Sequence, residues 1–310
     1  MKIITLTINP SIDKSIRIKG LQPDRKLRGG TPVLEPGGGG INVSRAIHKL
    51  GGTSECIYVA GGCLGDRLHE LLTEESIAQH VIDGPRETRE NVMVFDEATQ
   101  QQYRFITEGP PLRHKVWQRS LDMLSAQIDA GDYIVASGSL PPGVPTDYYA
   151  QVVKIGREKR AHVMVDTSGD ALRQAVRAGV YLLKPNLGEL STLTSQQAIT
   201  APEQERLAQQ LVEQHQAEVV VVSLGAQGAM LVTANRVEYI TAPTVPKKTT
   251  VGAGDSMVAG MVLRLSQDWE RSEAVRYGVA CGTAATMNHG TQLCRKEDVE
   301  RLYRWMSQQV

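Results

Sequence analysis

An acid stands at the entrance of an apolar helix in the segment TTVGAGDSMVAGMVLRL, residues 249–265. The N–H groups at a helix N-terminus have no partner within the helix, so they attract anions. The backbone of Gly252, Ala253 and Gly254 could donate these groups to a phosphate. Asp255, beside them, could accept the proton of an attacking hydroxyl. The pattern favours phosphoryl transfer to a hydroxyl group, although an aspartate that only caps the helix is a common alternative.

The position of Asp255 also predicts its strength as a base. A helix N-terminus stabilises negative charge, so we expect an ionised carboxylate that is a weak base. A weak base is sufficient for phosphoryl transfer, because the transition state is loose and the proton leaves the hydroxyl late. The sequence therefore predicts a proton acceptor that acts late in the reaction.

A glycine run precedes a second helix in EPGGGGINVSRAIHKLGG, residues 35–52, which Gly51 closes. Successive glycines let the backbone approach a ligand closely and point its N–H groups at that ligand. A dinucleotide fingerprint is excluded, because no G-x-G-x-x-G occurs here or at 252–257. A P-loop is excluded because the chain contains no Gly-Lys dipeptide.

The segment LLKPNLGEL, residues 182–190, ends a buried strand at Lys184 and turns at Pro185. Asn186 and Glu189 follow three residues apart, on one face of the next helix. Their oxygens suit a hard cation such as Mg²⁺, often through water. The alternative is an Asn that caps the helix and an acid in its first turn, which needs no metal.

Basic residues gather in two places, Arg25, Lys26 and Arg28 in one and Arg86 and Arg89 in the other. Guanidinium groups match phosphate oxygens in pairs, so these clusters favour a phosphorylated substrate. Solvated surface charge is the alternative for any single member.

Most of the chain alternates short β-branched runs with helical patterns, which predicts an α/β fold with a mostly parallel sheet. Four runs, at 133–137, 162–166, 181–184 and 219–223, end in small or polar residues. Ligands bind beyond the carboxyl ends of such strands. Candidates to line one crevice are therefore residues 137–139, Asp166, residues 184–186 and residues 223–225.

Two regions, about 11–35 and 86–108, alternate as hairpin strands would and lack helical periodicity. They predict a small antiparallel sheet added to a single domain of residues 1–310. That sheet could serve as a lid or a dimer surface, or it could be two decorative hairpins. The segment SLGAQGA, which starts at Ser223, reads by itself only as another hairpin.

Composition narrows the functional class. Lys plus Arg and Asp plus Glu are each 34, so the formal net charge is +0, and nucleic-acid or anionic-membrane binding gains no support. The apolar start of the chain is too short for a signal peptide or a membrane span. The cysteines show no zinc-binding spacing, so we expect reduced thiols in a cytoplasmic protein and no structural zinc. They are Cys56, Cys63, Cys281 and Cys294.

Four segments, in their order along the chain, resemble the ribokinase-like carbohydrate kinase family: PGGGGINVSRAI, LLKPNLGEL, SLGAQGA and TVGAGDSMVAG. NPSID (9–13), TREN (88–91) and SGSLPPGVP (137–145) look like its branch acting on phosphorylated hexoses. KLRGGTPVLEPGGGGINV and AATMNHGTQLC are similar to the minor-isozyme type of bacterial 6-phosphofructokinase. Gly39 stands where 1-phosphofructokinases and tagatose-6-phosphate kinases usually carry lysine, whereas ITEGPPL (106–112) departs from the minor-isozyme pattern.

The resemblance implies a ribokinase-like three-layer sandwich with a small antiparallel β lid. It implies ATP-dependent phosphorylation of the C1 hydroxyl of fructose 6-phosphate, with Mg²⁺ as cofactor and a monovalent cation such as K⁺. Tagatose-6-phosphate kinase, 1-phosphofructokinase and a non-catalytic sugar-phosphate-binding regulator are the alternatives. It also implies a homodimer through the lid, with a tetramer as a further assembly.

The resemblance assigns roles to residues that match the family motifs. Asp255 would be the base, and Gly252, Ala253 and Gly254 would stabilise the transferred phosphoryl group. The sugar residues would be Asp13, Gly38, Gly39, Asn42 and Ser139, with Arg89 and Arg28 on the 6-phosphate. The nucleotide residues would be Lys26, Lys184, Asn186, Ser223, Gly225 and Gly228. Glu189 would hold Mg²⁺ through water, and a monovalent cation would lie at Thr249, Val251, Ala285, Asn288 and Gly290.

Overall fold

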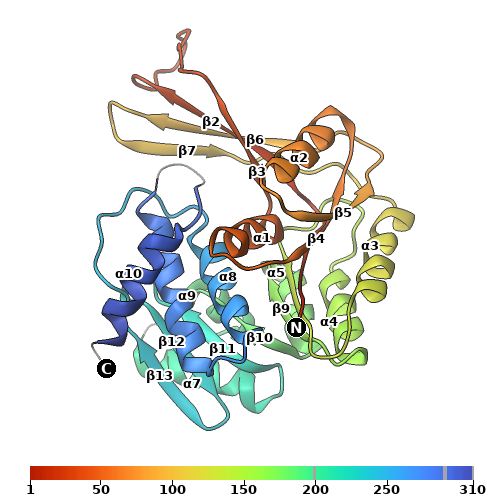
Figure 1. The fold of residues 1–310 in the computed structure, drawn as a ribbon, viewed down its shortest axis with the longest axis vertical. Helices are drawn as coiled ribbons and strands as arrows, with labels where there is room; N and C mark the ends of the chain where they lie inside the picture. Colours follow the sequence, from red (N-terminus) through yellow and green to blue (C-terminus); the bar gives the residue numbers. More distant parts are fainter. Residues whose placement is uncertain (198–199, 289–291, 309–310) are drawn as a thin grey trace.

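The computed structural model describes residues 1–197, 200–288 and 292–308. In these ranges the main sheet has nine strands in the order β13-β12-β11-β10-β9-β8-β1-β4-β5 (Figure 1). The pairs from β5 to β11 are parallel, whereas β12 and β13 extend one edge as antiparallel strands. This arrangement confirms the predicted α/β class with a mostly parallel sheet.

The bounds of the elements are as follows. The strands of the main sheet are β1 Ile3–Thr7, β4 Glu55–Ala60, β5 Ala78–Asp83, β8 Tyr133–Ser137, β9 His162–Asp166, β10 Val180–Leu183, β11 Ala217–Ser223, β12 Ala229–Thr233 and β13 Arg236–Ile240. The helices are α1 Gly39–Lys49, α2 Gly62–Glu74, α3 His114–Gln127, α4 Tyr148–Glu158, α5 Gly169–Arg177, α6 Leu187–Thr194, α7 Ala201–Glu213, α8 Ala253–Leu265, α9 Arg271–Thr286 and α10 Lys296–Ser307, with a 3₁₀ turn at Gly225–Gln227.

Helices cover both faces of the main sheet. Side chains of α1, α8, α9 and α10 form one buried cluster, and those of α3, α4, α5 and α7 form another. Neighbouring residues of one strand point to opposite clusters, as Ile3 and Ile4 of β1 do. The result is the predicted three-layer sandwich. No helix among the described residues is both long enough and apolar enough to cross a membrane.

The apolar runs located the parallel strands accurately. β8 and β9 coincide with the predicted runs at 133–137 and 162–166, while β10 and β11 begin one and two residues earlier than predicted. These four strands are neighbours in the sheet, so their carboxyl ends meet at one edge. The hairpin predicted around SLGAQGA is also present, because β11 and β12 pair antiparallel across the 3₁₀ turn.

A second sheet projects from the main body, near the top of Figure 1. In the described residues it has four strands in the order β3-β2-β6-β7, namely β2 Ser11–Ile18, β3 Val33–Gly37, β6 Arg89–Asp96 and β7 Gln101–Phe105. Each predicted hairpin region pairs antiparallel within itself. The two hairpins join through β2 and β6, which run parallel. Alternation within a strand gives no information on this pairing, because it does not identify the neighbouring strand.

The sheet order places a binding crevice next to β1. From β1 the chain first builds outward to β4 and β5, and then returns to build β8 through β11 on the other side. In open α/β sheets, ligands bind at such a switch point, beyond the carboxyl ends of the strands. Asn9 follows β1 and Ser139 follows β8, and their side chains meet there, with Asn9 Nδ2 donating to Ser139 Oγ at 3.0 Å.

Candidate active site

The N-terminus of α8 lies open toward the crevice. Gly252 is the N-cap residue, with φ of 72°, a left-handed conformation that favours glycine. No side chain of the described residues caps this helix end. The Ala253 N–H makes a long hydrogen bond of 3.4 Å to the Thr250 carbonyl, and the other N–H groups of the first turn can be offered to an anion. Asp255 is therefore not the helix cap, and that alternative is excluded.

Asp255 is held by a distant side chain. Asn42 of α1 donates from Nδ2 to Asp255 Oδ2 at 2.9 Å. Burial raises the pKa of the Asp255 carboxyl to about 7, and the negative charges of Asp166 and Asp13 also raise it, whereas the Asn42 hydrogen bond and Lys184 lower it. The carboxyl is therefore poised near neutral pH, where it can both accept and release a proton.

The expectation of an ionised, weakly basic Asp255 was wrong. A helix terminus stabilises a charge by about 0.3–1 kcal/mol, whereas one pKa unit corresponds to about 1.4 kcal/mol. Burial and the nearby carboxylates of Asp166 and Asp13 therefore outweigh the helix. These carboxylates come from other strands, so a local sequence pattern could not reveal them.

Lys184 is a buried positive charge close to Asp166 and acts electrostatically on Asp255 of α8. It follows β10, is 8% exposed, and its Nζ lies 4.0 Å from Asp166 Oδ2 at the end of β9. Its positive charge also lowers the pKa of Asp255. Gly254 lies beside it, since a Cβ atom there would stand 3.8 Å from Lys184 Nζ. The sequence placed Asp166 in this crevice but assigned it no chemical role, because an acid at a strand end is not diagnostic.

A cleft of about 600 Å³ opens beside the α8 entrance. Its volume is that of a typical small-molecule site. All predicted nucleotide residues except Lys26 line it, namely Lys184, Asn186, Ser223, Gly225 and Gly228. The sequence missed its apolar wall and several polar members, which are Val245, Val279, Lys247, Thr283 and Thr286. Val245 and Lys247 come from irregular chain, and the other three come from the second half of α9. Thr286 lies within AATMNHGTQLC, but that segment gave no sign of a nucleotide role.

Asn186 and Glu189 cap the N-terminus of α6 and also line the cleft. Asn186 Oδ1 accepts from the Glu189 backbone N–H, and Glu189 Oε2 accepts from the Asn186 N–H, both at 2.9 Å. Burial raises the pKa of Glu189. Both residues still line the cleft, so the capping interpretation does not exclude a second role. Within the described ranges no group of three or more His, Cys, Asp or Glu could hold a metal by itself.

Arg89 of β6 is a positive charge bound to backbone oxygens. It donates to the carbonyls of Asn9 at 3.0 Å, Pro10 at 3.3 Å and Thr107 at 2.9 Å. None of the described acidic side chains forms an ion pair with Arg89. A guanidinium has five N–H donors, so two remain for an anion. Burial lowers the pKa of Arg89, an effect that the negative charge of Asp13 opposes.

Asp13 of β2 is buried beside the glycine run. Its Oδ1 accepts from Ser11 Oγ at 2.8 Å and from Asn91 Nδ2 at 2.9 Å. A Cβ on Gly37 would overlap this carboxylate, and a Cβ on Gly39 would overlap Ser137 Oγ. Gly38 has φ of 117°. The glycines therefore allow close approach to the protein's own side chains, whereas the glycine run had predicted close approach to a ligand.

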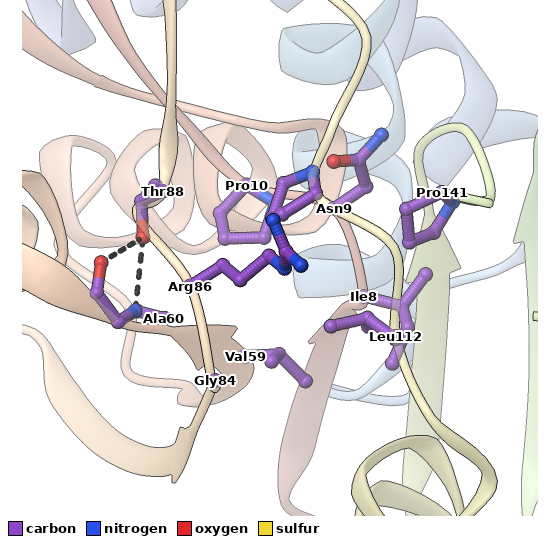
Figure 2. A pocket seen from close by; sticks show the side chains of 12 residues that line it. Ile8, Asn9, Pro10, Val59, Ala60, Gly84, Arg86, Thr88, Leu112 and Pro141 are labelled. Atoms are coloured by element: carbon purple, nitrogen blue, oxygen red, sulfur yellow. Dashed lines mark hydrogen bonds between the residues drawn. The ribbon is translucent and has the colours of Figure 1, made fainter. Parts of the chain in front are cut away.

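A small cavity lies under the Asn9–Pro10 segment, and Figure 2 shows the Arg86 side chain pointing toward that segment. The cavity has a volume of about 10 Å³, which is room for about one water molecule and not for a sugar. Arg86 thus differs from Arg89, with which the sequence grouped it. Lys26 and Arg28 lie exposed between β2 and β3, and neither lines the large cleft.

The described members of the predicted cation set lie on two adjoining segments, the loop before α8 and the C-terminal end of α9 with the residues that follow it. Thr249 and Val251 precede α8, and Ala285 and Asn288 lie at the end of α9. The segments are joined by the backbone N–H groups of residues 248 and 249, which donate to the Thr286 carbonyl at 2.8 and 3.2 Å. The predicted fifth member, Gly290, lies outside the described residues.

Comparison with known proteins agrees with this geometry. The chain is 41% identical to the ATP-dependent 6-phosphofructokinase isozyme 2 of Escherichia coli (strain K12) over 308 residues, which cover 99% of each protein. It is 31% identical to the 1-phosphofructokinase of Bacillus subtilis (strain 168), covering 97% of both.

Solved structures of phosphofructokinase-2 from Escherichia coli superpose closely. The complex with fructose-6-phosphate has a TM-score of 0.94 at 38% identity, and the complex with potassium has a TM-score of 0.96 at 40% identity. The tetrameric inhibited form has a TM-score of 0.94 at 39% identity. Each of these matches covers 99% of both chains. The ribokinase of Arabidopsis thaliana shares the fold, with a TM-score of 0.76 at 17% identity over 98% of both chains. Residues 6–298 match the family described as pfkB family carbohydrate kinase. The chain therefore belongs to the pfkB family of carbohydrate kinases.

Proposed function

We propose that this protein phosphorylates the C1 hydroxyl of fructose 6-phosphate, with ATP as the phosphoryl donor. The observation that carries the proposal is the placement of Asp255, which Asn42 holds beside the uncapped end of α8. The full-length similarity to an ATP-dependent 6-phosphofructokinase supports the same reaction. The free cysteines fit a cytoplasmic enzyme, which we propose as its location.

The residues divide the reaction between them. Asp255 accepts the proton of the C1 hydroxyl as the oxygen attacks the γ-phosphorus of ATP, while the bond from that phosphorus to its bridging oxygen breaks and ADP leaves. The N–H groups of Gly252, Ala253 and Gly254 stabilise the negative charge that the transferred group carries. Lys184, buried in the cleft, neutralises phosphate charge on the nucleotide side, and Ser223, Gly225 and Gly228 line the nucleotide's place. Lys26 belongs to this nucleotide set in our proposal.

Two cations complete the proposal. Mg²⁺ is usually bound by one or two carboxylates together with substrate phosphates, and Glu189 offers one carboxylate within the cleft, through water. Bound there, the ion would neutralise phosphate charge. The segments with Thr249, Val251, Ala285 and Asn288 fit a monovalent cation such as K⁺, since they supply oxygen atoms close to the α8 entrance. Gly290 completes that proposed set.

On the acceptor side, Asp13, Asn42, Ser139 and the backbone of Gly38 and Gly39 hold the sugar hydroxyls. Arg89 binds the 6-phosphate, and we propose that Arg28 joins it from the exposed segment after β2. We favour fructose 6-phosphate over the alternative acceptors because Gly39 stands where 1-phosphofructokinases and tagatose-6-phosphate kinases usually carry lysine. Ser137 Oγ also leaves no room for a side chain at position 39. Tagatose 6-phosphate and fructose 1-phosphate remain the second candidates.

Turnover with three acceptors tests this function. ADP release from MgATP is measured with fructose 6-phosphate, tagatose 6-phosphate and fructose 1-phosphate, and kcat/KM is compared. We expect a clear preference for fructose 6-phosphate. Preference for another sugar would keep the kinase mechanism and refute the assignment at Gly39, while no turnover with any of them would favour a sugar-phosphate-binding regulator.

The rate should depend on pH through Asp255. Its pKa of about 7 means that the carboxyl is protonated below neutral pH and cannot then accept the hydroxyl proton. We expect kcat/KM for the sugar phosphate to rise with pH, through a midpoint near 7, and to level off above it. A profile that is flat between pH 5.5 and 8.5, a range of about one and a half pH units on each side of that midpoint, would contradict this role.

An Asn42→Ala variant identifies which group titrates. The amide of Asn42 lowers the pKa of Asp255, so its loss should move the midpoint to higher pH. The phosphate of the substrate also titrates near neutrality, but the substitution does not alter that ionisation. A midpoint that stays in place would assign the profile to the substrate.

We also propose a homodimer formed through the small sheet, with a tetramer as a further assembly. Large exposed apolar residues concentrate on the small-sheet region, where Val33, Phe105 and Ile106 are 57, 54 and 62% exposed. An apolar surface of this kind is usually covered by a partner. Light scattering should give a dimer mass, and the double variant Phe105→Asp/Ile106→Asp should give a monomer. Trp305→Asp on α10, also exposed, is the control that should stay dimeric.

A further inference from the structure

Arg45 of α1 is a buried cation that the proposed reaction does not use. It is 3% exposed. Its Nε and Nη2 donate to Glu75 Oε2 and Oε1 at 2.8 and 2.6 Å, and its Nη1 donates to the Pro36 carbonyl at 3.0 Å. Glu35 Oε1 lies 3.8 Å from Nη2. Such a paired charge is costly to bury and more costly to leave unpaired, so its partners must stay in place.

Arg45 and its partners connect three separate elements, α1, α2 and β3. Glu75 ends α2, whereas Glu35 and Pro36 belong to β3, the strand by which the small sheet returns to the main body. Arg45 itself lies on α1, one helical turn after Asn42. It therefore fixes the crossing from β3 into the glycine run against both helices.

The crossing controls the place of Asp13. In the antiparallel pair of β2 and β3, the backbone of Asp13 lies opposite that of Glu35. The Asp13 carboxylate packs so closely against Gly37 that no Cβ atom fits at position 37. A shift of the Pro36 carbonyl would therefore move the Asp13 carboxylate relative to Asn42. The nucleotide cleft lies on other elements, and none of its lining residues belongs to β2 or β3.

We propose that Arg45 is a positioning residue that sets the geometry of the acceptor subsite through Pro36 and Asp13, without touching the substrate. The inference rests on the proposed function, because it assumes that Asp13 binds the sugar. Misplacement of a binding group by about 1 Å can cost on the order of 100-fold in rate. Loss of Arg45 therefore affects affinity for the sugar phosphate and leaves affinity for ATP unchanged.

The test compares Arg45→Met with a matched control. For Arg45→Met we expect the KM for fructose 6-phosphate to rise by about tenfold or more, with the KM for ATP unchanged. Arg276→Met is the control, because Arg276 is also buried, at 8% exposure, and pairs with Glu273 of α9 and Glu238 of β13. It should lower the melting temperature by a similar amount and leave both KM values unchanged.

A milder variant guards against misfolding of Arg45→Met. Glu75→Gln keeps a hydrogen-bond acceptor and removes the charge, so it should raise the sugar-phosphate KM less, in the same direction. Equal KM values in the wild type and in every folded Arg45 or Glu75 variant would overturn the inference, as would an equal rise in Arg276→Met. Absence of turnover in the wild type would instead refute the proposed function.

Discussion

Replacement of Asp255 by asparagine is expected to lower kcat by about 10²- to 10⁴-fold, the range typical of a lost general base. The amide has nearly the same shape as the carboxyl, and its oxygen can still accept the hydrogen bond that Asn42 donates to Asp255. What disappears is the ability to accept a proton. Affinity for ATP should remain nearly intact, because the nucleotide contacts come from the cleft lined by Lys184 and Ser223.

Single-turnover rates and calorimetric titration with MgATP measure the two effects separately. Asp170→Asn is the matched control, since Asp170 lies exposed on α5 and pairs only with Arg173 among the contacts of the described residues. It should leave both the rate and the affinity unchanged. A near-normal rate in Asp255→Asn would show that another group accepts the proton. A midpoint near pH 7 in the rate profile could then not be assigned to the Asp255 carboxyl.

The architecture could be predicted from sequence because its determinants are local. Runs of β-branched residues marked β8 and β9 to the residue, since strands buried on both faces must be apolar throughout. The sheet edge then followed from a general rule about carboxyl ends. The parallel pairing of β2 with β6 escaped prediction, because it joins strands almost 80 residues apart and leaves no mark on either one.

The electrostatics of the site escaped prediction for a similar reason. The helix position of Asp255 was predicted correctly, but its pKa depends first on burial and then on Asp166, Asn42 and Asp13, which three other elements supply. The glycine run shows the same limit. Glycine at position 39 suggested a ligand, yet a Cβ atom there would collide with Ser137 Oγ at the end of β8. Local patterns identified which residues matter, while tertiary contacts decide what each of them does.

Arg89→Ala should raise the KM for fructose 6-phosphate by about 10- to 100-fold, because a hydrogen bond to a charged group contributes about 1.5–3 kcal/mol. Three backbone carbonyls hold the Arg89 guanidinium in place, so its remaining N–H groups are fixed before a phosphate arrives. Such preorganisation reduces the entropy lost on binding. Steady-state kinetics at saturating MgATP measures the change, and kcat should fall less than affinity.

Two variants separate charge from geometry in this prediction. Arg86→Ala removes a neighbouring guanidinium that points toward the same Asn9–Pro10 segment, over a cavity that holds only about one water (Figure 2). It should change the KM little, which would show that proximity of positive charge is insufficient. Arg89→Lys keeps the charge and loses the planar fork, so an intermediate KM is expected. If Arg86→Ala and Arg89→Ala gave equal effects, the 6-phosphate would bind elsewhere, and the hydrogen bonds of Arg89 to Asn9, Pro10 and Thr107 would serve only to join β6 to the end of β1.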